Sequence, residues 1–251
     1  MKLVVLTYPY HYHITQLAIN QAKKHFPNID LTYIIWDDTH KFKPSMPLYE
    51  CMKDCVQISW SRLNLKAVGW AGQQIIKLHL DTVINEKEFI ILDGDLIINQ
   101  DLDPKNVLYS GALPRQHGAY DHLSEVLGLG VYSFNTCPFM FVEARWLKEI
   151  RELCLLHSHM TLEEKLTQSA NQNGFLDWNI IAQYQLRCLK STKKIEYFHR
   201  SPMSAKQLEM SFNDTQNFVL NGPDNFSIEF LESKNITVDR NLMRQLNYIH
   251  D

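Results

Sequence analysis

The sequence lacks the features that mark several large classes of protein. No apolar run approaches the roughly 20 residues needed to cross a bilayer, which predicts that there is no integral membrane segment. The first residues, MKLVVLTYPYHYH, lack the length and the flanks of a signal peptide, so we expect a cytoplasmic protein. Neither sign of charge dominates, because 25 basic and 28 acidic side chains give a formal charge of −3. This balance argues against a nucleic-acid partner and against a polybasic membrane patch.

Paired cysteines, internal repeats and low-complexity linkers are also missing. The five cysteines are scattered and form no C-x-x-C pair. Such spacing supports neither a disulfide framework nor a zinc site, and reduced thiols are the simplest interpretation. What is present is ordinary: 251 residues, of which 45% are apolar and 21% charged. This composition is typical of a globular protein with a substantial core.

Apolar runs of two different periods predict an α/β fold. The β-branched runs at 3–8 and 31–37 flank a stretch of helical spacing at 14–26, which is the order of a parallel βαβ unit. A helical pattern from Gly72 to about residue 85 leads into the apolar run FIIL at 89–92. We expect one domain with a mostly parallel, Rossmann-like sheet, flanking helices and a less regular C-terminal part. Further strands are expected at 138–142 and 195–199, and further helices at 144–157, 161–171 and 177–190.

Two aspartates interrupt an apolar stretch, EFIILDGDLIINQ (88–100). Asp93 and Asp95 stand where the strand is expected to end, and ligands of open α/β sheets bind beyond the carboxyl ends of strands. An unpaired charge there is expensive, so we expect a cation. Mg²⁺ and Mn²⁺ prefer oxygen ligands, and Mg²⁺ typically takes one or two carboxylates plus substrate phosphates. Gly94 is expected to allow an unusual backbone conformation between them. The alternative is a turn with two solvated aspartates.

The stretch GWAGQQIIKLHLDTVINEKEFIILDGDLIINQDL (69–102) resembles the DxD-containing GT-A glycosyltransferases. The similarity is to a microbial branch with a G-W-x-x-Q-Q-x-x-K-L helix ahead of its L-D-x-D strand, and it is weaker over 125–200. It implies one GT-A-like glycosyltransferase domain over 1–251, with a nucleotide-binding half (1–100) and an acceptor-binding half (101–251). The implied reaction moves a sugar from a nucleoside-diphosphate sugar to a glycan or other hydroxyl acceptor, in surface glycan synthesis.

The resemblance implies a metal site at the two aspartates. Asp93 and Asp95 would bind Mn²⁺ or Mg²⁺, which bridges the diphosphate and stabilises the charge of the departing nucleoside diphosphate. His199, at the end of the last expected strand, would complete the metal shell. The alternative is that His199 is an ordinary histidine at the end of a strand.

Nucleotide contacts are implied at three further places. Thr7 and Tyr8 follow the first strand, where the base is cradled, and Asp37 and Asp38 end the second, where base or ribose is contacted. Asp93 and Gly94 are expected to contact the nucleotide as well. Gln74 and Lys77 lie one helical turn apart, and Lys77 would reach phosphate or sugar oxygens. A solvated helix face is the alternative for this pair.

Asp177 is the candidate for acid–base chemistry. GFLDWNIIAQYQL (174–186) resembles the family's stretch in which an acidic residue opens a helix near the acceptor. Asp177 would take the acceptor's proton in an inverting enzyme, but an Asp here could equally cap the helix, and it is shorter than the family's usual Glu. Trp70, Tyr120 and Trp178 are expected either to stack on sugars or to be buried, and the loop at 115–130 is a candidate acceptor lid.

Two other classes of function fit parts of this pattern. A haloacid-dehalogenase-type phosphatase also places D-x-D after an apolar strand, with the first Asp as nucleophile. That motif usually opens its domain, whereas about 90 residues precede it here. The other alternative is a non-catalytic module that binds a sugar nucleotide or a glycan.

Overall fold

The computed structural model of this chain forms two compact units. The first comprises Met1–Ser61, Leu92–Asp103 and His199–Asp251, and the second comprises Arg62–Ile91 and Pro104–Phe198. Each unit draws on both of the expected halves, 1–100 and 101–251, and the single-domain organisation stays a prediction. The described residues are 1–8, 11–26, 28–38, 52–63, 69–111, 127–128, 139–170, 177–198, 201–213, 218–220 and 226–245.

A mostly parallel central sheet confirms the α/β class. Its strand order is β3-β2-β1-β4-β7, where β2 is Leu31–Trp36, β3 is Cys55–Ser59 and β7 is Phe139–Glu143. The apolar runs of β1 (Lys2–Thr7) and β4 (Glu88–Asp93) are fully buried, as expected for strands that are covered on both faces. Among the described residues, no helix has both the length and the apolar character needed to cross a bilayer.

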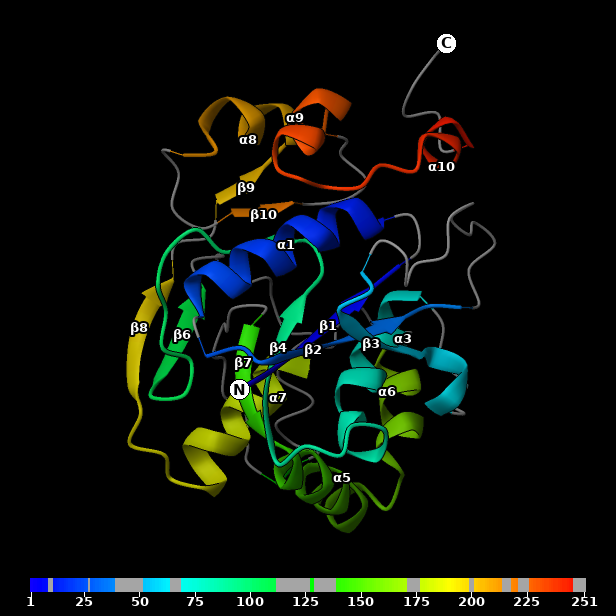
Figure 1. The fold of residues 1–251 in the computed structure, drawn as a ribbon. Coiled ribbons are helices and arrows are strands. Elements are labelled where there is room, and N and C mark those ends of the chain that lie inside the picture. Colours follow the sequence, from blue (N-terminus) through cyan, green and yellow to red (C-terminus); the bar gives the residue numbers. More distant parts are fainter. Residues whose placement is uncertain are drawn as a thin grey trace. The chain divides into compact units, whose positions relative to one another are not determined.

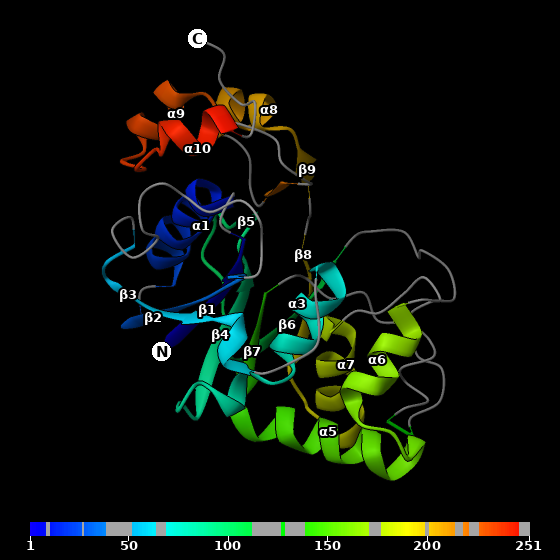
Figure 2. The same ribbon diagram turned by 90° about the vertical axis from the view of Figure 1, so that its right-hand side faces the viewer.

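The first unit contains the predicted βαβ motif. β1 pairs in parallel with β2 (Leu31–Trp36), and α1 (Tyr12–His25) connects them. The sequence did not reveal β3 (Cys55–Ser59), which pairs in parallel with β2. Figures 1 and 2 show α1 along one face of these strands. Three basic residues in its last turn complement the negative end of the helix dipole.

A smaller sheet and the C-terminal helices complete the first unit. β5 (Leu96–Ile97) runs antiparallel to β10 (Phe218–Leu220), which runs parallel to β9 (Ser201–Met203). The Gln16 side chain exchanges hydrogen bonds of 3.4 and 3.2 Å with the Thr237 backbone, which fixes the C-terminal segment on α1. The helices of this part are α8 (Ala205–Ser211), α9 (Ile228–Ser233) and α10 (Arg240–Gln245).

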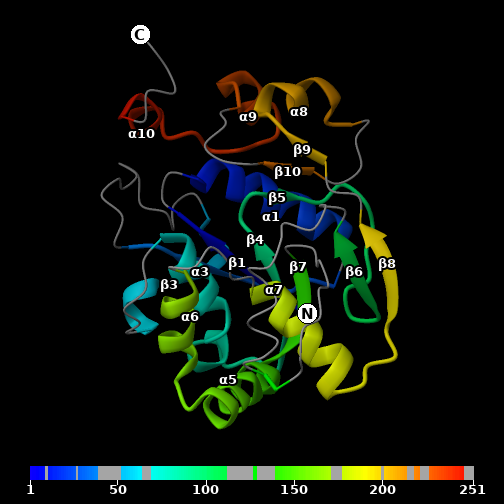
Figure 3. The same cartoon turned by 180° about the vertical axis from the view of Figure 1, so that it is seen from behind.

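The second unit is mainly helical and also carries β7 (Phe139–Glu143) and a two-stranded parallel sheet. Figure 3 shows its helices grouped together. β6 (Val107–Gly111) lies in a stretch that was expected to be loop, and it pairs with β8 (Lys194–Phe198). The strand expected at 195–199 therefore belongs to this small sheet and not to the central one. The helices of this unit are α3 (Gly69–Lys77), α5 (Ala144–Ser158), α6 (Leu162–Ala170), α7 (Asp177–Gln183) and the π-helical turn η4 (Tyr184–Cys188).

α3 ends at Lys77, well before the predicted end near residue 85. The chain then tightens into the 3₁₀ turn η3 (Leu80–Thr82), and the His79 amide donates to the Ile76 carbonyl at 2.9 Å. His79 also uses its ring, because Nδ1 donates to the Ile75 carbonyl at 2.9 Å. A side chain that binds the helix's own last turn thus replaces the hydrogen bonds of a continued helix.

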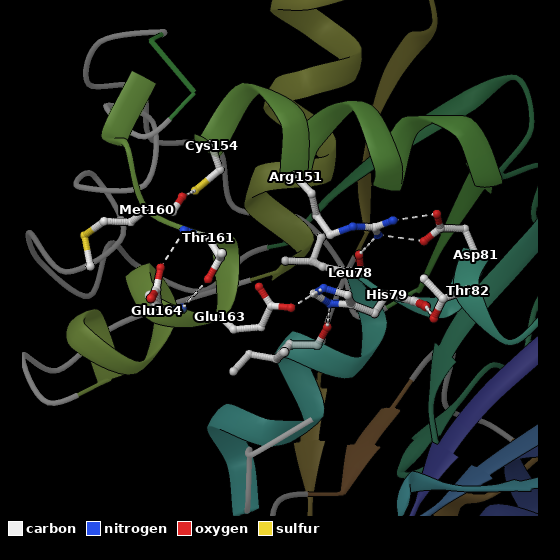
Figure 4. Close-up of polar contacts among 11 residues, drawn as sticks. Leu78, His79, Asp81, Thr82, Arg151, Cys154, Met160, Thr161, Glu163 and Glu164 are labelled. Atoms are coloured by element: carbon white, nitrogen blue, oxygen red, sulfur yellow. Dashed lines mark hydrogen bonds and ion pairs between the residues drawn. The ribbon is translucent and has the colours of Figure 1, made fainter. Parts of the chain in front are cut away.

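Charged side chains clamp this turn to the neighbouring helices. Arg151 of α5 binds both carboxylate oxygens of Asp81 at 2.7 Å, and it also donates to the Leu78 carbonyl. His79 Nε2 lies 2.8 Å from Glu163 of α6 (Figure 4). The turn that follows α3 is therefore held by contacts distant in sequence, which a local helical pattern does not reveal.

Candidate functional site

Predicted site residues meet in the first unit, at the carboxyl end of β1. On one side, the Asp37 amide, just after β2, donates to the Thr7 carbonyl at 3.2 Å. On the other side, the Gly94 amide donates to the Leu6 carbonyl at 3.1 Å. We call residues 93–95 the D-G-D turn; both of its carboxylates are half-buried. This is the edge of an α/β sheet at which a ligand is expected.

Close packing, and not an unusual backbone angle, explains the glycine of the D-G-D turn. A Cβ at Gly94 would stand 2.6 Å from the Leu6 carbonyl oxygen and 2.8 Å from Thr15 Oγ1. Among the described glycines a positive φ occurs at Gly128, not at Gly94. The prediction of an unusual conformation is therefore wrong. Gly94 is required because β1 and α1 pass too close for any side chain, and this contact fixes the backbone between the two carboxylates.

Thr7 and Tyr8 differ in what they can offer a nucleotide. Thr7 is buried, and its hydroxyl lies 2.6 Å from Thr15 Oγ1, so that it ties β1 to α1. Tyr8 is half-buried and packs edge-on against the Trp60 ring, with 5.5 Å between ring centroids. A ligand at this edge would meet the Tyr8 ring before the Thr7 hydroxyl. The nucleotide contacts of both residues stay predictions.

The two aspartates after β2 also differ. Asp38 accepts hydrogen bonds from the Ser61 amide at 3.0 Å and from the Ser61 hydroxyl, and thereby holds the 3₁₀ turn η2 (Trp60–Leu63). That turn carries the ring that packs on Tyr8. The Asp38 carboxylate thus has a structural task, while Asp37 is buried beside the end of β1. Asp37 is the better candidate for a ligand contact, which remains a prediction.

His13 is a buried residue that sequence reasoning missed. It lies in the first turn of α1, it is fully buried, and neither ring nitrogen has a hydrogen-bond partner in the described part of the chain. Burial, and to a smaller extent the charge of His11, lower the pKa of His13 to about 3. The imidazole is therefore neutral at pH 7. The only signal in the sequence was the Y-H-Y-H run that follows the first strand.

The second unit brings together the candidate residues of α3 and α7. Gln74 and Lys77 are 1% and 2% exposed, so the alternative of a solvated helix face is wrong. Lys77 Nζ lies 4.0 Å from the ring centroid of Trp178, a cation–π contact of the kind worth about 2 kcal/mol when it is desolvated. Trp178 is buried, as one of its two predicted roles requires. α7 begins at Asp177, as predicted, but its side chain lies outside the described residues.

Several predicted residues lie outside the described part of the chain. These are His199, Tyr120, the side chain of Trp70, and the loop at 115–130 except for residues 127–128. Within the described residues, no group of three or more His, Cys, Asp or Glu side chains is placed to hold a metal ion. The D-G-D turn nevertheless fits Mg²⁺ or Mn²⁺, because two carboxylates on a fixed backbone, completed by substrate phosphates, are a usual ligand set for these ions.

Comparison with known proteins bears on the fold. Residues 35–126 match a family that is described as a family of unknown function (DUF6492). No curated protein sequence matches this chain. Similar solved structures include the galactosyltransferase LgtC in complex with donor and acceptor sugar analogues, at a TM-score of 0.51 and 14% identity over 98% of this chain and 99% of that one. An active-site mutant of LgtC is similar at a TM-score of 0.51 and 14% identity, over 97% of this chain and 99% of that one.

This chain has the LgtC fold. The prediction of a GT-A-like fold is therefore confirmed. At 14% identity the likeness concerns the fold alone, and the activity has to be argued from the residues of this chain.

Proposed function

We propose that this chain is a metal-dependent glycosyltransferase that moves a sugar from a nucleoside-diphosphate sugar to a hydroxyl acceptor, in surface glycan synthesis. One observation carries the proposal. The D-G-D turn sits at the carboxyl end of β4, bonded to the end of β1 and packed where only glycine fits, in a chain whose fold is that of a galactosyltransferase. A solvated turn would not require such close packing of its backbone.

The carboxylates of the D-G-D turn would hold Mn²⁺ or Mg²⁺, with His199 as a further ligand. The bound cation would supply Lewis-acid stabilisation of the negative charge on the departing nucleoside diphosphate. Tyr8 and Asp37, which flank the end of β1, would contact the base and the ribose. Because Gly94 has no side chain, the diphosphate can approach the backbone closely at that point.

Residues of the second unit would act on the sugar and the acceptor. Gln74 and Lys77 would contact phosphate or sugar oxygens, with the Lys77 ammonium oriented by the Trp178 ring beneath it. The acceptor hydroxyl oxygen bonds to the anomeric carbon while the bond from that carbon to the β-phosphate oxygen breaks, and the nucleoside diphosphate leaves with the electron pair. In an inverting enzyme Asp177 would take the acceptor's proton. In a retaining enzyme Asp177 need not be a base.

A thermal-shift panel tests the proposal with the full chain. UDP and GDP, free and as sugar conjugates, are added with and without Mn²⁺; we expect at least one nucleotide to raise Tm only when Mn²⁺ is present. Asp93→Asn should abolish that shift. Asp101→Asn is the matched control, because Asp101 is 90% exposed and, as far as the structure describes the chain, is paired with His25 at the surface. A panel without any Mn²⁺-dependent shift refutes the metal role.

Turnover separates the proposed enzyme from the two other classes. Release of the nucleoside diphosphate from the best-bound donor, measured with and without glycan acceptors, identifies a transferase. Binding without turnover for every acceptor identifies a non-catalytic module. Cleavage of p-nitrophenyl phosphate identifies a phosphatase, a class that the LgtC fold and the roughly 90 residues ahead of Asp93 both oppose.

A further inference from the structure

The second unit contains a cavity that no part of the proposed reaction uses. Its volume is about 280 Å³, and its lining includes Glu88, Lys105, Phe141, Trp146, Gln185 and Lys193. Glu88 is the first residue of β4, whereas Asp93 is the last, five residues or about 17 Å further along an extended strand. The lining of the cavity therefore includes the first residue of β4 and none of the residues of the D-G-D turn.

Two buried polar side chains in the cavity wall lack partners. Gln185 is 1% exposed, and neither its amide nitrogen nor its amide oxygen has a hydrogen-bond partner among the described residues. Trp146 is 4% exposed, and its indole N–H is likewise unpaired within the described chain. Buried polar groups are nearly always hydrogen-bonded, so each such exception needs a cause. Two of them in one cavity wall indicate a ligand that supplies the missing partners.

The local backbone shows that this wall is preformed. Gln185 lies on η4, a π-helical turn, and such turns are rare and are frequent at functional sites. The Ser191 amide donates to the Gln185 carbonyl at 2.9 Å, which fixes the chain after the turn. The Tyr184 hydroxyl donates to Glu149 of α5, the helix that also carries Trp146. The backbone on either side of both unpaired side chains is thus held by hydrogen bonds that need no ligand.

Both ammonium groups and carboxylates line the cavity. Lys193 Nζ lies 4.8 Å from the Phe141 ring centroid and 5.6 Å from that of Trp146, and Lys105 Nζ lies 5.3 Å from that of Phe141. The carboxylates of the lining are each paired with a cation, since Glu88 accepts from Lys105 and Glu143 from Arg145, both at 2.7 Å. Among the buried atoms of this wall that lack a partner within the described chain, two are N–H donors (Trp146 and Gln185) and one is an acceptor, the Gln185 amide oxygen, which favours an anionic ligand.

We propose that this cavity binds a small hydroxylated anion of monosaccharide size, a sugar carboxylate or a sugar phosphate. Its anionic oxygens accept hydrogen bonds from the Trp146 indole, the Gln185 amide nitrogen and Lys193, and one of its hydroxyls donates to the Gln185 amide oxygen. The volume holds about nine groups the size of a water molecule, which is at the small end of ligand pockets. This site does not depend on the proposed transferase function.

Calorimetric titration of the full chain tests the site with three probes: glucuronate, glucose 6-phosphate and glucose. We expect glucuronate or glucose 6-phosphate to bind at millimolar concentration or below, and glucose to bind at least about tenfold more weakly. Gln185→Leu and Lys193→Gln should each weaken the anion by about tenfold or more. Lys194→Gln is the matched control. It removes the same charge at the next residue, whose side chain is outside the cavity lining and is paired with Glu196.

Three outcomes overturn the site: no binding of any probe to the unaltered chain, equal affinity for glucose and the anions, or unchanged affinity in both variants. If Gln185→Leu does not fold, Trp146→Phe takes its place beside Lys193→Gln. This change keeps an aromatic ring and removes the indole N–H together with part of the ring system. The proposed transferase function can fail without this site failing, because the Mn²⁺-dependent nucleotide shift is a separate readout on the same protein.

Discussion

Gly94→Ala tests how the D-G-D turn is held. The added methyl group would stand 2.6 Å from the Leu6 carbonyl oxygen, which belongs to the backbone of β1 and cannot rotate away. Overpacking of this kind costs about 1–3 kcal/mol. The hydrogen bond from the Gly94 amide to the same carbonyl would also be weakened, which adds about 1 kcal/mol. We therefore expect the free energy of unfolding to fall by about 3 kcal/mol.

Urea unfolding followed by circular dichroism measures this loss. Asp95→Ala serves as the control, because it removes atoms from the same turn and adds none; it should reduce the unfolding free energy far less while weakening Mn²⁺-dependent nucleotide binding. Gly94→Ala should reduce both the free energy of unfolding and the Mn²⁺-dependent binding of nucleotide. A Gly94→Ala protein with unchanged stability and unchanged nucleotide binding would show that the close approach of β1, α1 and this turn is not needed.

Three further predictions concern single side chains. Folding lowers the pKa of His13 from 6.5 to about 3, so the unfolded chain binds one more proton between these values, and stability falls as the pH falls below 6.5. From pH 7 to pH 5 the free energy of unfolding should fall by about 2 kcal/mol through this group, and this loss should vanish in His13→Leu. Urea unfolding that gave the same pH profile for the unaltered protein and for His13→Leu would contradict the prediction. Arg151→Met should lower the free energy of unfolding by about 2–3 kcal/mol, because it leaves the Asp81 carboxylate without its bidentate partner. Adding Asp81→Asn to this variant should cause little further loss, and additive losses in thermal unfolding would refute the pairing. Asp177→Asn should retain Mn²⁺-dependent donor binding but lose turnover, and undiminished release of nucleoside diphosphate would dismiss it as the base.

The elements whose hydrophobic pattern is local were predictable from the sequence. β1, α1, β2 and the strand before Asp93 follow directly from apolar runs and helical spacing, and their order fixes a parallel sheet. The place of the D-G-D turn at the end of that strand also follows from the pattern. Parallel strands place their carboxyl ends at one edge, so Asp37 and Gly94 could be expected at the same edge; the strand order that puts β1 between them comes from the structure.

Features that depend on distant contacts were not predictable. α3 stops at Lys77 because His79, Asp81 and their partners on α5 and α6 hold the following turn, and a helical pattern read along one segment contains no sign of those partners. β6 and β8 are short strands whose pairing requires each other. The reason for Gly94 is a close approach in space, which a sequence does not show. Gln185 looked like one polar residue of a helix; only its burial and its missing partners mark it.

The binding of Mn²⁺ by the D-G-D turn can be measured directly. Mn²⁺ is titrated into the full chain in the presence of the nucleoside diphosphate that gives the largest thermal shift, and free Mn²⁺ is followed by its electron paramagnetic resonance signal. We expect the unaltered protein to remove one Mn²⁺ per chain from solution, and Asp93→Asn and Asp95→Asn to bind it at least about tenfold more weakly, with Asp101→Asn unchanged. Equal Mn²⁺ binding by the unaltered protein and by both variants would contradict the metal-dependent function proposed for this chain.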